Sequence, residues 1–581
     1  MYCIIQGVSY RSEETKNMKA ILIIALILSS SFAKLVEKSS LQVLRGDYKP
    51  KMPSSIVGSA KLVEGQKTQS VADQDEIKKL FPNTYGMPFL TFEKTNLSVK
   101  GDPINVGVIL SGGQAPGGHN VISGIYDGIK AINKNSRLYG FLGGSSGLVD
   151  HKYIELTEDI INEYRNTGGF DMIGSGRTKL EEESQFDKGL EICKKLGIKA
   201  IVIIGGDDSN TNACVLAEYY LKNKSGVQVI GVPKTIDGDL KNEMIETSFG
   251  FDTATKVYSE VIGNIERDAN SAKKYWHFIK LMGRSASHVT LECALKTRPN
   301  IALIGEEVEQ KNQSLEDIVN YIASVVKARA DKGMNFGTAL IPEGLIEFIP
   351  AIKKLIQELN DMLAANQKEL DKISDNEKIK FVGEHLSKEN AAIFKSLPEN
   401  VSKQLALERD PHGNVQVSLI ATEQLLADMV AKKLDQWKKE GKYNGKFATQ
   451  KHFFGYEGRC AAPSNFDADY CYSLGRVASL LINAGKTGYM SSVRNLTKPA
   501  SEWIAGGIPI TAMMNMEKRS GKMKPVIQKA LVKLDDGPFK YFASKREEWA
   551  INTDFNYPGP IQYWGPSEVT DITTETIQHE H

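Results

Sequence analysis

The sequence predicts an α/β protein with two doubly wound, Rossmann-like parallel-sheet lobes, a helical insertion, and an active site between the lobes. Two observations support this prediction. Short apolar runs end repeatedly in turns of Gly, Asp, Lys or Arg, and helical stretches separate these runs. The chain has 581 residues, which is too long for one ordinary hydrophobic core, so at least two domains are expected.

The stretch 198–239 shows this pattern most completely. An apolar run at 200–204 ends in the turn GGDD at 205–208, and a helical run follows. A second apolar run at 227–232 ends in PKTIDGD at 233–239. Because ligands bind at the carboxyl edge of open parallel sheets, we expect the chemical centre of the protein here.

The first α/β lobe is expected over residues 101–270. Its first strand, Asn105–Leu110, runs into the glycine-rich turn SGGQAPGGHN at 111–120, and a helical pattern follows. Such a turn leaves backbone N–H groups free at a helix N-terminus, which suits a phosphate. The alternative is a purely structural turn, since the dinucleotide pattern GxGxxG is absent from it.

The second α/β lobe is expected over residues 271–350 and 447–560. Its predicted strands end in MGR at 282–284 and PEG at 342–344, and GYEGR follows at 455–459. The intervening segment is rich in Lys, Glu, Leu and Gln, which predicts a helical insertion over 351–446. Residues 41–100 are interpreted as an N-terminal wrapping segment, and residues 561–581 as a C-terminal tail.

The first 40 residues resemble a targeting segment. From Met18 a lysine, a short apolar run and Ser31-Phe32-Ala33 follow the pattern of a secretory signal, although 17 residues precede Met18. The apolar run is too short to span a membrane. Residues 1–40 are thus expected to be a signal-like or disordered extension, and the alternative to a functional signal is a disordered segment or a weak apolar helix outside the fold.

Composition excludes several classes of partner. The formal net charge is +1, so no global field attracts nucleic acid or an anionic membrane, and we expect neither as a partner. The six cysteines show no CxxC spacing, which argues against a thiolate metal site and a disulfide framework. An anionic substrate therefore requires a local cluster of cations.

The strand ends supply the residue types that phosphoryl transfer needs. They carry Asp207 and Asp208, then Lys234, Asp237 and Asp239, and further along Arg284 and Glu343. This reaction uses a metal-holding acid, a base for the attacking hydroxyl and cations for the phosphoryl charge. Helix capping is the alternative for a single aspartate, but it does not explain one lysine and two aspartates within six residues.

Six motifs in order resemble the phosphofructokinase family, and within it the long, pyrophosphate-dependent kind. They are SGGQAPGGHN at Ser111, GGDDSNTNA at Gly205, PKTIDGD at Pro233, KLMGR at Lys280, PEG at Pro342 and GYEGR at Gly455. The resemblance covers about residues 41 to 560. It implies phosphoryl transfer from pyrophosphate to the 1-hydroxyl of fructose 6-phosphate, with Mg²⁺ as cofactor.

The resemblance also implies roles for individual residues. Asp237 would be the base, Asp207 would hold Mg²⁺, and Gly112 and Gly113 would face the diphosphate. Asp208, Lys234 and Arg284 would complete the catalytic set. The sugar phosphate would be bound by Thr235, Ile236, Asp237, Lys274, Tyr275, Met282, Gly283, Arg284, Glu343, Tyr456, Glu457, Gly458 and Arg459. Lys274 and Tyr275 would reach into a neighbouring subunit's site, so the resemblance implies a homodimer or a larger homo-oligomer.

Two positions carry the expected choice of donor. ATP-dependent relatives have glycine at the positions of Asp208 and Lys234. A carboxylate at 208 fills the space for a nucleotide's α-phosphate and repels it. Lys234 places a cation beside the reacting phosphates.

Two other functions compete with this interpretation. An ATP-dependent phosphofructokinase would have glycine at 208 and 234. A catalytically silent regulatory subunit would have lost some of Asp207, Lys234, Asp237 and Arg284, and all four are present. A cytoplasmic location is expected from the substrates, with Met18–Ala33 pointing to secretion or organelle targeting as the alternative.

Overall fold

The computed structural model describes residues 40–96, 101–370, 372–409, 415–519, 522–561 and 567–580. Residues 1–48 form one unit, whose described part is helix α2 (Ser40–Gly46). Residues 49–581 form the second unit, which contains a nine-stranded, a four-stranded and a two-stranded sheet. The signal-like segment Met18–Ala33 lies outside the described residues. Among the described helices none is long and apolar enough to cross a membrane.

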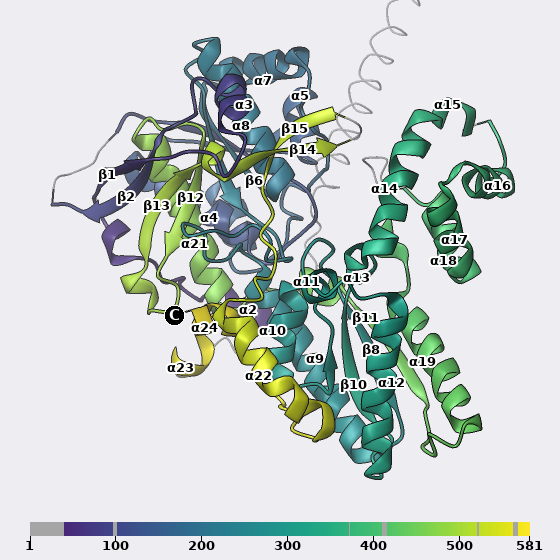
Figure 1. Cartoon of the computed structure of the whole chain (residues 1–581). Helices are drawn as coiled ribbons and strands as arrows, with labels where there is room; N and C mark the ends of the chain where they lie inside the picture. Colours follow the sequence, from purple (N-terminus) through teal and green to yellow (C-terminus); the bar gives the residue numbers. More distant parts are fainter. Residues whose placement is uncertain are drawn as a thin grey trace, which may run out of the picture. The chain divides into compact units, whose positions relative to one another are not determined.

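The larger sheet has nine strands in the order β1-β2-β13-β12-β7-β6-β3-β4-β5 (Figure 1). Their bounds are β1 Ala60–Lys67, β2 Pro88–Lys94, β3 Asn105–Leu110, β4 Leu138–Phe141, β5 Tyr153–Glu155, β6 Ile198–Gly205, β7 Gln228–Pro233, β12 Tyr489–Arg494 and β13 Ile504–Pro509. The central strands from β12 to β4 run parallel, and β1, β2, β13 and β5 join with antiparallel pairings.

Helices follow the strands of this lobe as expected for a doubly wound sheet. They are α3 Gln74–Leu80, α4 Gly118–Ile132, α5 Ser145–Val149, α6 Glu158–Tyr164, α7 Glu183–Leu196, α8 Asp207–Lys222 and α21 Asn465–Asn483. Neighbouring strands β3, β6 and β7 are buried along nearly their whole length, so their polar ends emerge together at one edge of the sheet.

The smaller sheet is parallel, in the order β11-β8-β10-β9. Its strands are β8 Trp276–Leu281, β9 Ile301–Ala302, β10 Gly337–Pro342 and β11 Thr449–Phe454. Its helices are α9 Phe251–Ala272, α10 His288–Thr297, α11 Gly305–Gln310, α12 Leu315–Asp331, α13 Leu345–Phe348, α20 Tyr456–Arg459 and α22 Gly537–Ile551. The ends of β8, β10 and β11 lie side by side, because these three strands are neighbours.

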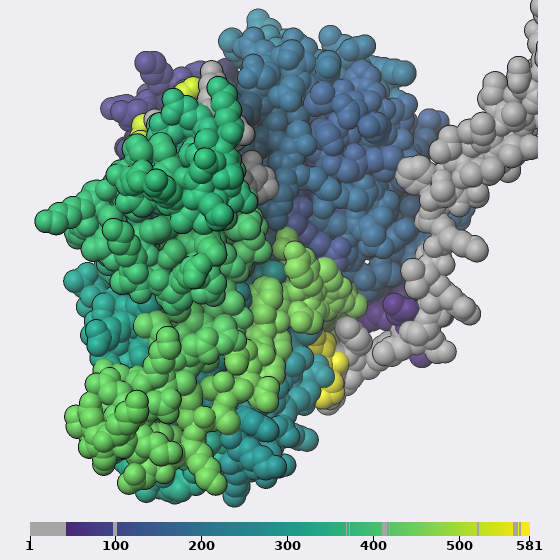
Figure 2. Space-filling model, turned by 90° about the vertical axis from the view of Figure 1, so that its right-hand side faces the viewer, coloured from purple at the N-terminus to yellow at the C-terminus, as the bar shows by residue number. Residues whose placement is uncertain are grey.

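The segment expected as an insertion is helical and packs on the smaller sheet. It comprises α14 Pro350–Ala365, α15 Gln367–Leu370, α16 Asp375–His385, α17 Lys388–Ser396, α18 Glu399–Leu407 and α19 Thr422–Lys439. Leu355, Leu405 and Leu426 from these helices share one hydrophobic core with Phe278 and Ile341 of the sheet. In Figure 2 the atoms of this part of the chain, in green, form a continuous surface.

One expected domain boundary is wrong. The sequence pattern places residues 447–560 in the second lobe, but β12 and β13 pair within the larger sheet. The chain returns there through α21, which packs along α4. Part of the expected wrapping segment, 41–100, likewise becomes the strands β1 and β2 of this sheet. A short apolar run predicts a strand without indicating which sheet it joins.

The C-terminal part of the chain adds a hairpin and three helices. The hairpin consists of β14 Met514–Arg519 and β15 Lys522–Ile527, and α23 Ser567–Thr570 and α24 Glu575–Glu580 follow α22. The cysteines at 193, 214, 293 and 471 are buried and unbridged, and Cys460 is exposed and also unbridged.

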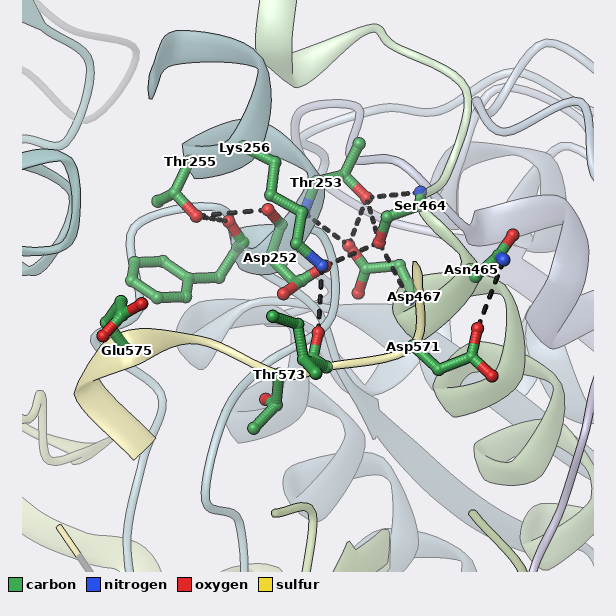
Figure 3. A network of polar contacts seen from close by, with 12 residues as sticks. Asp252, Thr253, Thr255, Lys256, Ser464, Asn465, Asp467, Asp571, Thr573 and Glu575 are labelled. Atoms are coloured by element: carbon green, nitrogen blue, oxygen red, sulfur yellow. Dashed lines mark hydrogen bonds and ion pairs between the residues drawn. The ribbon is translucent and has the colours of Figure 1, made fainter. Parts of the chain in front are cut away.

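A buried polar network joins the N-termini of α9 and α21 (Figure 3). Asp467 accepts hydrogen bonds from the backbone N–H groups of Gly250 and Thr253, at 3.1 and 2.9 Å, and from the Thr253 hydroxyl at 2.5 Å. Ser464 donates to Asp252 at 2.6 Å. Burial, and then the neighbouring Asp252, raise the pKa of Asp467 to about 7. The network fixes the ends of two loops, 234–250 and 460–464, that lead away from the strand ends described above.

The variant Asp467→Ala should lose about 3 kcal/mol in free energy of unfolding, because three buried donors lose their acceptor. Denaturant titration measures this loss. Asp75→Ala, which removes an exposed carboxylate of α3, is the control and should change stability by less than about 0.5 kcal/mol. Equal stabilities of the two variants would contradict the role given to the network.

Candidate active site

A cavity of about 510 Å³ lies where the strand ends of the two sheets face each other. Residues that follow β3, β6 and β7 line one side, and residues that follow β8, β10 and β11 line the other. The lining residues are Ser111, Gly112, Gly113, Gln114, Arg177, Thr178, Lys179, Gly206, Asp207, Asp208, Ser209, Asn212, Lys234, Thr235, Ile236, Asp237, Asp239, Met282, Arg284, Ser285, Glu343, Gln416, Tyr456, Arg459 and Lys529.

The glycine-rich turn after β3 brings three distant segments together. Lys234 donates a hydrogen bond from Nζ to the carbonyl of Gly113 at 2.8 Å. Arg459 donates from Nε to the carbonyl of Gln114 at 2.9 Å. A Cβ atom on Gly113 would lie 1.2 Å from Nη2 of Arg459, so a side chain at this position would force the guanidinium group to move. Gly112 has a φ of +83°, which also favours glycine.

Lys234 is a buried cation with weakened affinity for its proton. Burial, and next the charge of Arg459, lower the pKa of Lys234 to about 8. Asp237 and Asp207 act in the opposite direction. The ammonium group thus faces the glycine-rich turn from the end of β7, with carboxylates close by.

Asp207 and Asp208 open helix α8 at the end of β6. The Oδ2 atom of Asp207 is buried and accepts no hydrogen bond from any described residue. The nearest cations are Lys529 at 3.8 Å and Arg519 at 4.0 Å. A buried carboxylate oxygen without a hydrogen-bond donor, at the edge of a polar cavity, suits a hard cation such as Mg²⁺.

Asp208 is held between two cations. It accepts hydrogen bonds from Lys179 at 3.2 Å and from Arg519 at 2.6 Å. Burial acts to raise the pKa of Asp208, but Lys179 and Arg519 outweigh it and hold that pKa below its ordinary value. Asp208 is therefore a charged carboxylate in a fixed position.

Asp237 and Asp239 follow β7 and have different surroundings. The backbone N–H of Asp237 donates to the Thr235 hydroxyl at 3.1 Å. Burial, and then the charge of Asp237, raise the pKa of Asp239 to about 7. Lys529 lies 3.8 Å from Asp239 and donates to Ser285 at 2.7 Å, so it bridges the two sides of the cavity.

The opposite side is built from the ends of β8, β10 and β11. Glu343 accepts a hydrogen bond from the N–H of Gly283 at 2.9 Å, and burial raises the pKa of Glu343. The backbone of Arg284 packs against Gly344, the residue after Glu343. A Cβ atom at position 344 would lie 1.8 Å from the carbonyl oxygen of Arg284, so glycine permits this contact. This side carries the guanidinium groups of Arg284 and Arg459 and one buried carboxyl group.

Thirteen of the predicted site residues line the cavity. They are Gly112, Gly113, Asp207, Asp208, Lys234, Thr235, Ile236, Asp237, Met282, Arg284, Glu343, Tyr456 and Arg459. Tyr456 is 65% exposed. The structure thus brings together residues up to 347 positions apart in the sequence, from Gly112 to Arg459.

Five predicted residues do not line it. Gly283 donates its N–H to Glu343 of the site, Glu457 accepts from the N–H of Gly455, and Gly458 packs against the ring of Tyr258. Lys274 and Tyr275 lie just before the start of β8, and Met282 of the cavity lies just after its end. The six residues of the strand rise about 3.3 Å each, so its two ends are about 20 Å apart. Lys274 and Tyr275 do not belong to the cavity of their own chain.

Several lining residues were not predicted. Arg177 and Lys179 follow a small-residue turn at 174–176 whose neighbouring cation is visible in the sequence. Gln416 comes from the segment between α18 and α19. Lys529 follows the C-terminal hairpin, where no strand-end motif marks it. Arg519 of the same hairpin does not line the cavity but pairs with Asp208, which does.

Comparisons with known proteins identify the family of this chain. The Phosphofructokinase family profile matches residues 105–482. A Porphyromonas gingivalis protein named pyrophosphate–fructose 6-phosphate 1-phosphotransferase is 62% identical, over 94% of this chain and 99% of that protein. An Entamoeba histolytica protein of the same name is 52% identical, over 93% of this chain and 98% of its own.

A solved structure shares the fold at low sequence identity. It is described as a pyrophosphate-dependent phosphofructokinase from Nitrosospira multiformis, with a TM-score of 0.51 and 15% identity, covering 81% of this chain and 96% of that one. The ordered motifs, the two-lobed fold and these matches lead to one conclusion. The chain belongs to the phosphofructokinase family.

Proposed function

We propose that this protein transfers a phosphoryl group from pyrophosphate to the 1-hydroxyl of D-fructose 6-phosphate, giving fructose 1,6-bisphosphate and phosphate. The names of its relatives support this activity. The observation that carries the choice of donor is that the anchored carboxylate of Asp208 and the buried cation of Lys234 line the same cavity. The two sides of the reaction are close in energy, so it should run in both directions.

The donor is proposed to bind on the side built from β3, β6 and β7. Gly112 and Gly113 let the diphosphate approach the backbone, and Lys234 stabilises negative charge on the donor and on the leaving phosphate. Asp208 occupies the space that a nucleotide would need and repels its anionic α-phosphate. Asp207 would hold Mg²⁺, which when bound neutralises diphosphate charge.

The sugar phosphate is proposed to bind on the other side. Arg284 and Arg459 provide guanidinium groups for the 6-phosphate, and Glu343 provides an acceptor for sugar hydroxyls. Asp237 accepts the proton of the 1-hydroxyl as that oxygen forms its bond to phosphorus and the bridging P–O bond of the donor breaks. Positioning of the two substrates supplies much of the rate gain. Thr235, Ile236, Met282, Gly283, Tyr456, Glu457 and Gly458 complete the proposed pocket.

Lys274 and Tyr275 support a proposal about assembly. They lie at the opposite end of β8 from the cavity of their own chain. We propose that they contact fructose 6-phosphate in a neighbouring subunit of a homodimer or larger homo-oligomer. A cytoplasmic location is proposed because both substrates are intracellular metabolites.

Initial rates measured with each donor test the proposed function. With fructose 6-phosphate and Mg²⁺ present, pyrophosphate should support turnover and ATP should support little. Preferred use of ATP would overturn the proposal. A pure single-chain preparation that is inactive with both donors would instead indicate a silent subunit.

The variant Asp237→Ala should lower kcat on the order of 10³-fold, because the attacking hydroxyl loses its base. Binding of fructose 6-phosphate, measured by calorimetry, should change little, since the guanidinium groups remain. Asp150→Ala, at an exposed carboxylate away from the cavity, is the control for assay and folding. A kcat within tenfold of the unmodified protein would refute the role of Asp237.

The variant Asp208→Gly should raise kcat/KM for ATP relative to kcat/KM for pyrophosphate. The substitution removes both the volume and the charge that oppose a nucleotide. On the order of a tenfold change in this ratio is expected from one displaced charge contact. No gain in ATP use would show that the account of donor choice is wrong.

The pH dependence should report Lys234. Its charged form is required, so kcat/KM for pyrophosphate should be high below about pH 8 and fall as Lys234 loses its proton above that pH. In Lys234→Arg the charge persists, and the fall should move to higher pH. If kcat/KM for pyrophosphate falls at the same alkaline pH in Lys234→Arg as in the unmodified protein, a group other than Lys234 causes the fall.

A further inference from the structure

The hairpin β14–β15 lies against the first turns of α8. The backbone N–H of Ile527 donates to the Thr211 hydroxyl at 3.1 Å, and Lys524 pairs with Glu181 at 3.1 Å. The other strand is fixed by the N–H of Met516, which donates to Asp73 at 2.8 Å. The hairpin is thus attached both to α8 and to the loop that carries Lys179.

Arg519 extends from the end of β14 to the two aspartates of α8. Its Nη1 donates to Oδ1 of Asp208 at 2.6 Å, and its Nη2 lies 4.0 Å from Asp207. Glu517 of the same strand contacts Nη2 at 3.3 Å. Arg519 itself does not line the cavity, whereas Asp208 does. The guanidinium group therefore supports the carboxylate from outside the substrate space.

Lys179 holds the same oxygen of Asp208 from the cavity side, at 3.2 Å. The loop that carries Lys179 is fixed to α8, because Asn212 exchanges two hydrogen bonds with the backbone of Leu180, at 3.1 and 2.6 Å. Asp208 therefore has one cation on each side, and both are carried by segments attached to its own helix.

Anchoring matters for a residue that excludes a ligand. An aspartate side chain changes rotamer at small energetic cost unless its oxygens are held. A carboxylate that is free to turn away would relieve its clash with an incoming nucleotide and would discriminate weakly. A hydrogen bond to a charged group is the stronger kind and opposes that rotation.

We propose that Arg519 is a positioning residue that sets donor choice by holding the Asp208 carboxylate in the space a nucleotide would occupy. This inference rests on the proposed function of Asp208 as the group that excludes ATP. Arg519 acts through Asp208 and does not contact either substrate. The C-terminal hairpin is then part of the specificity machinery, although it contains no strand-end motif.

A double-mutant cycle tests the inference, with the ratio of kcat/KM for pyrophosphate to kcat/KM for ATP as the readout. Arg519→Gln should lower this ratio about tenfold when Asp208 is present, mainly through increased ATP use. In an Asp208→Gly background the same substitution should change the ratio by less than about twofold, since nothing remains to be positioned. Arg519→Lys, which keeps the charge, should restore most of the preference.

The control is Lys518→Gln, at the neighbouring position of β14. Lys518 is exposed and pairs at 3.6 Å with Asp361 of α14, so its loss should leave the ratio unchanged. Thermal melts of all variants show whether each one is folded, so that a changed donor ratio is not mistaken for an effect of unfolding. Arg519→Met replaces Arg519→Gln if the latter does not fold.

Three outcomes would overturn the inference. One is an unchanged ratio in Arg519→Gln, and another is an equal fall in both backgrounds, which would mean that Arg519 binds the donor directly. The third is an Arg519→Lys variant that loses as much preference as Arg519→Gln. If the unmodified protein prefers ATP, or if Asp208→Gly leaves the ratio unchanged, the proposed function fails first and the inference fails with it.

Discussion

The close approach of Arg459 to the backbone of Gly113 is the constraint on which the site depends. Arg459 belongs to α20, which follows β11 of the smaller sheet. Its side chain contacts the turn that follows β3 of the larger sheet. Lys234 reaches the same glycine from a third segment. A Cβ atom at 113 would overlap the guanidinium group of Arg459 and force it to shift, so the two halves of the site meet in this arrangement where one residue has no Cβ.

Charge is organised around that junction in two layers. Within the cavity, burial lowers the pKa of Lys234 and raises that of Asp239. Arg519 from behind the cavity and Lys179 from the cavity side keep Asp208 charged and in place. Desolvated charges interact strongly at short range, so such a site can discriminate between donors that differ by one nucleoside phosphate unit. The buried Asp467 network fixes the far end of the loop 234–250, which carries Lys234 and Asp239.

Local patterns predicted the strand ends and the charged residues that follow them, because an apolar run that stops at Gly, Asp or Lys marks the carboxyl edge of a strand. Family resemblance added Thr235, Ile236, Met282, Tyr456 and Arg459, which also line the cavity. They could not predict where β12 and β13 pair, since pairing is decided by tertiary contacts. Arg519 and Lys529 were missed for the same reason: they reach the site through a hairpin whose sequence resembles any exposed ribbon. Lys274 and Tyr275 came only from family resemblance.

The most direct test is a competition measured in one sample. Fructose 6-phosphate, Mg²⁺, pyrophosphate and ATP are mixed with the full chain, and phosphorus NMR follows both donors. The account predicts that the pyrophosphate signal falls as phosphate and a sugar bisphosphate appear in equal amounts, while the ATP signals persist. Loss of the ATP γ-phosphate signal with pyrophosphate intact would contradict it.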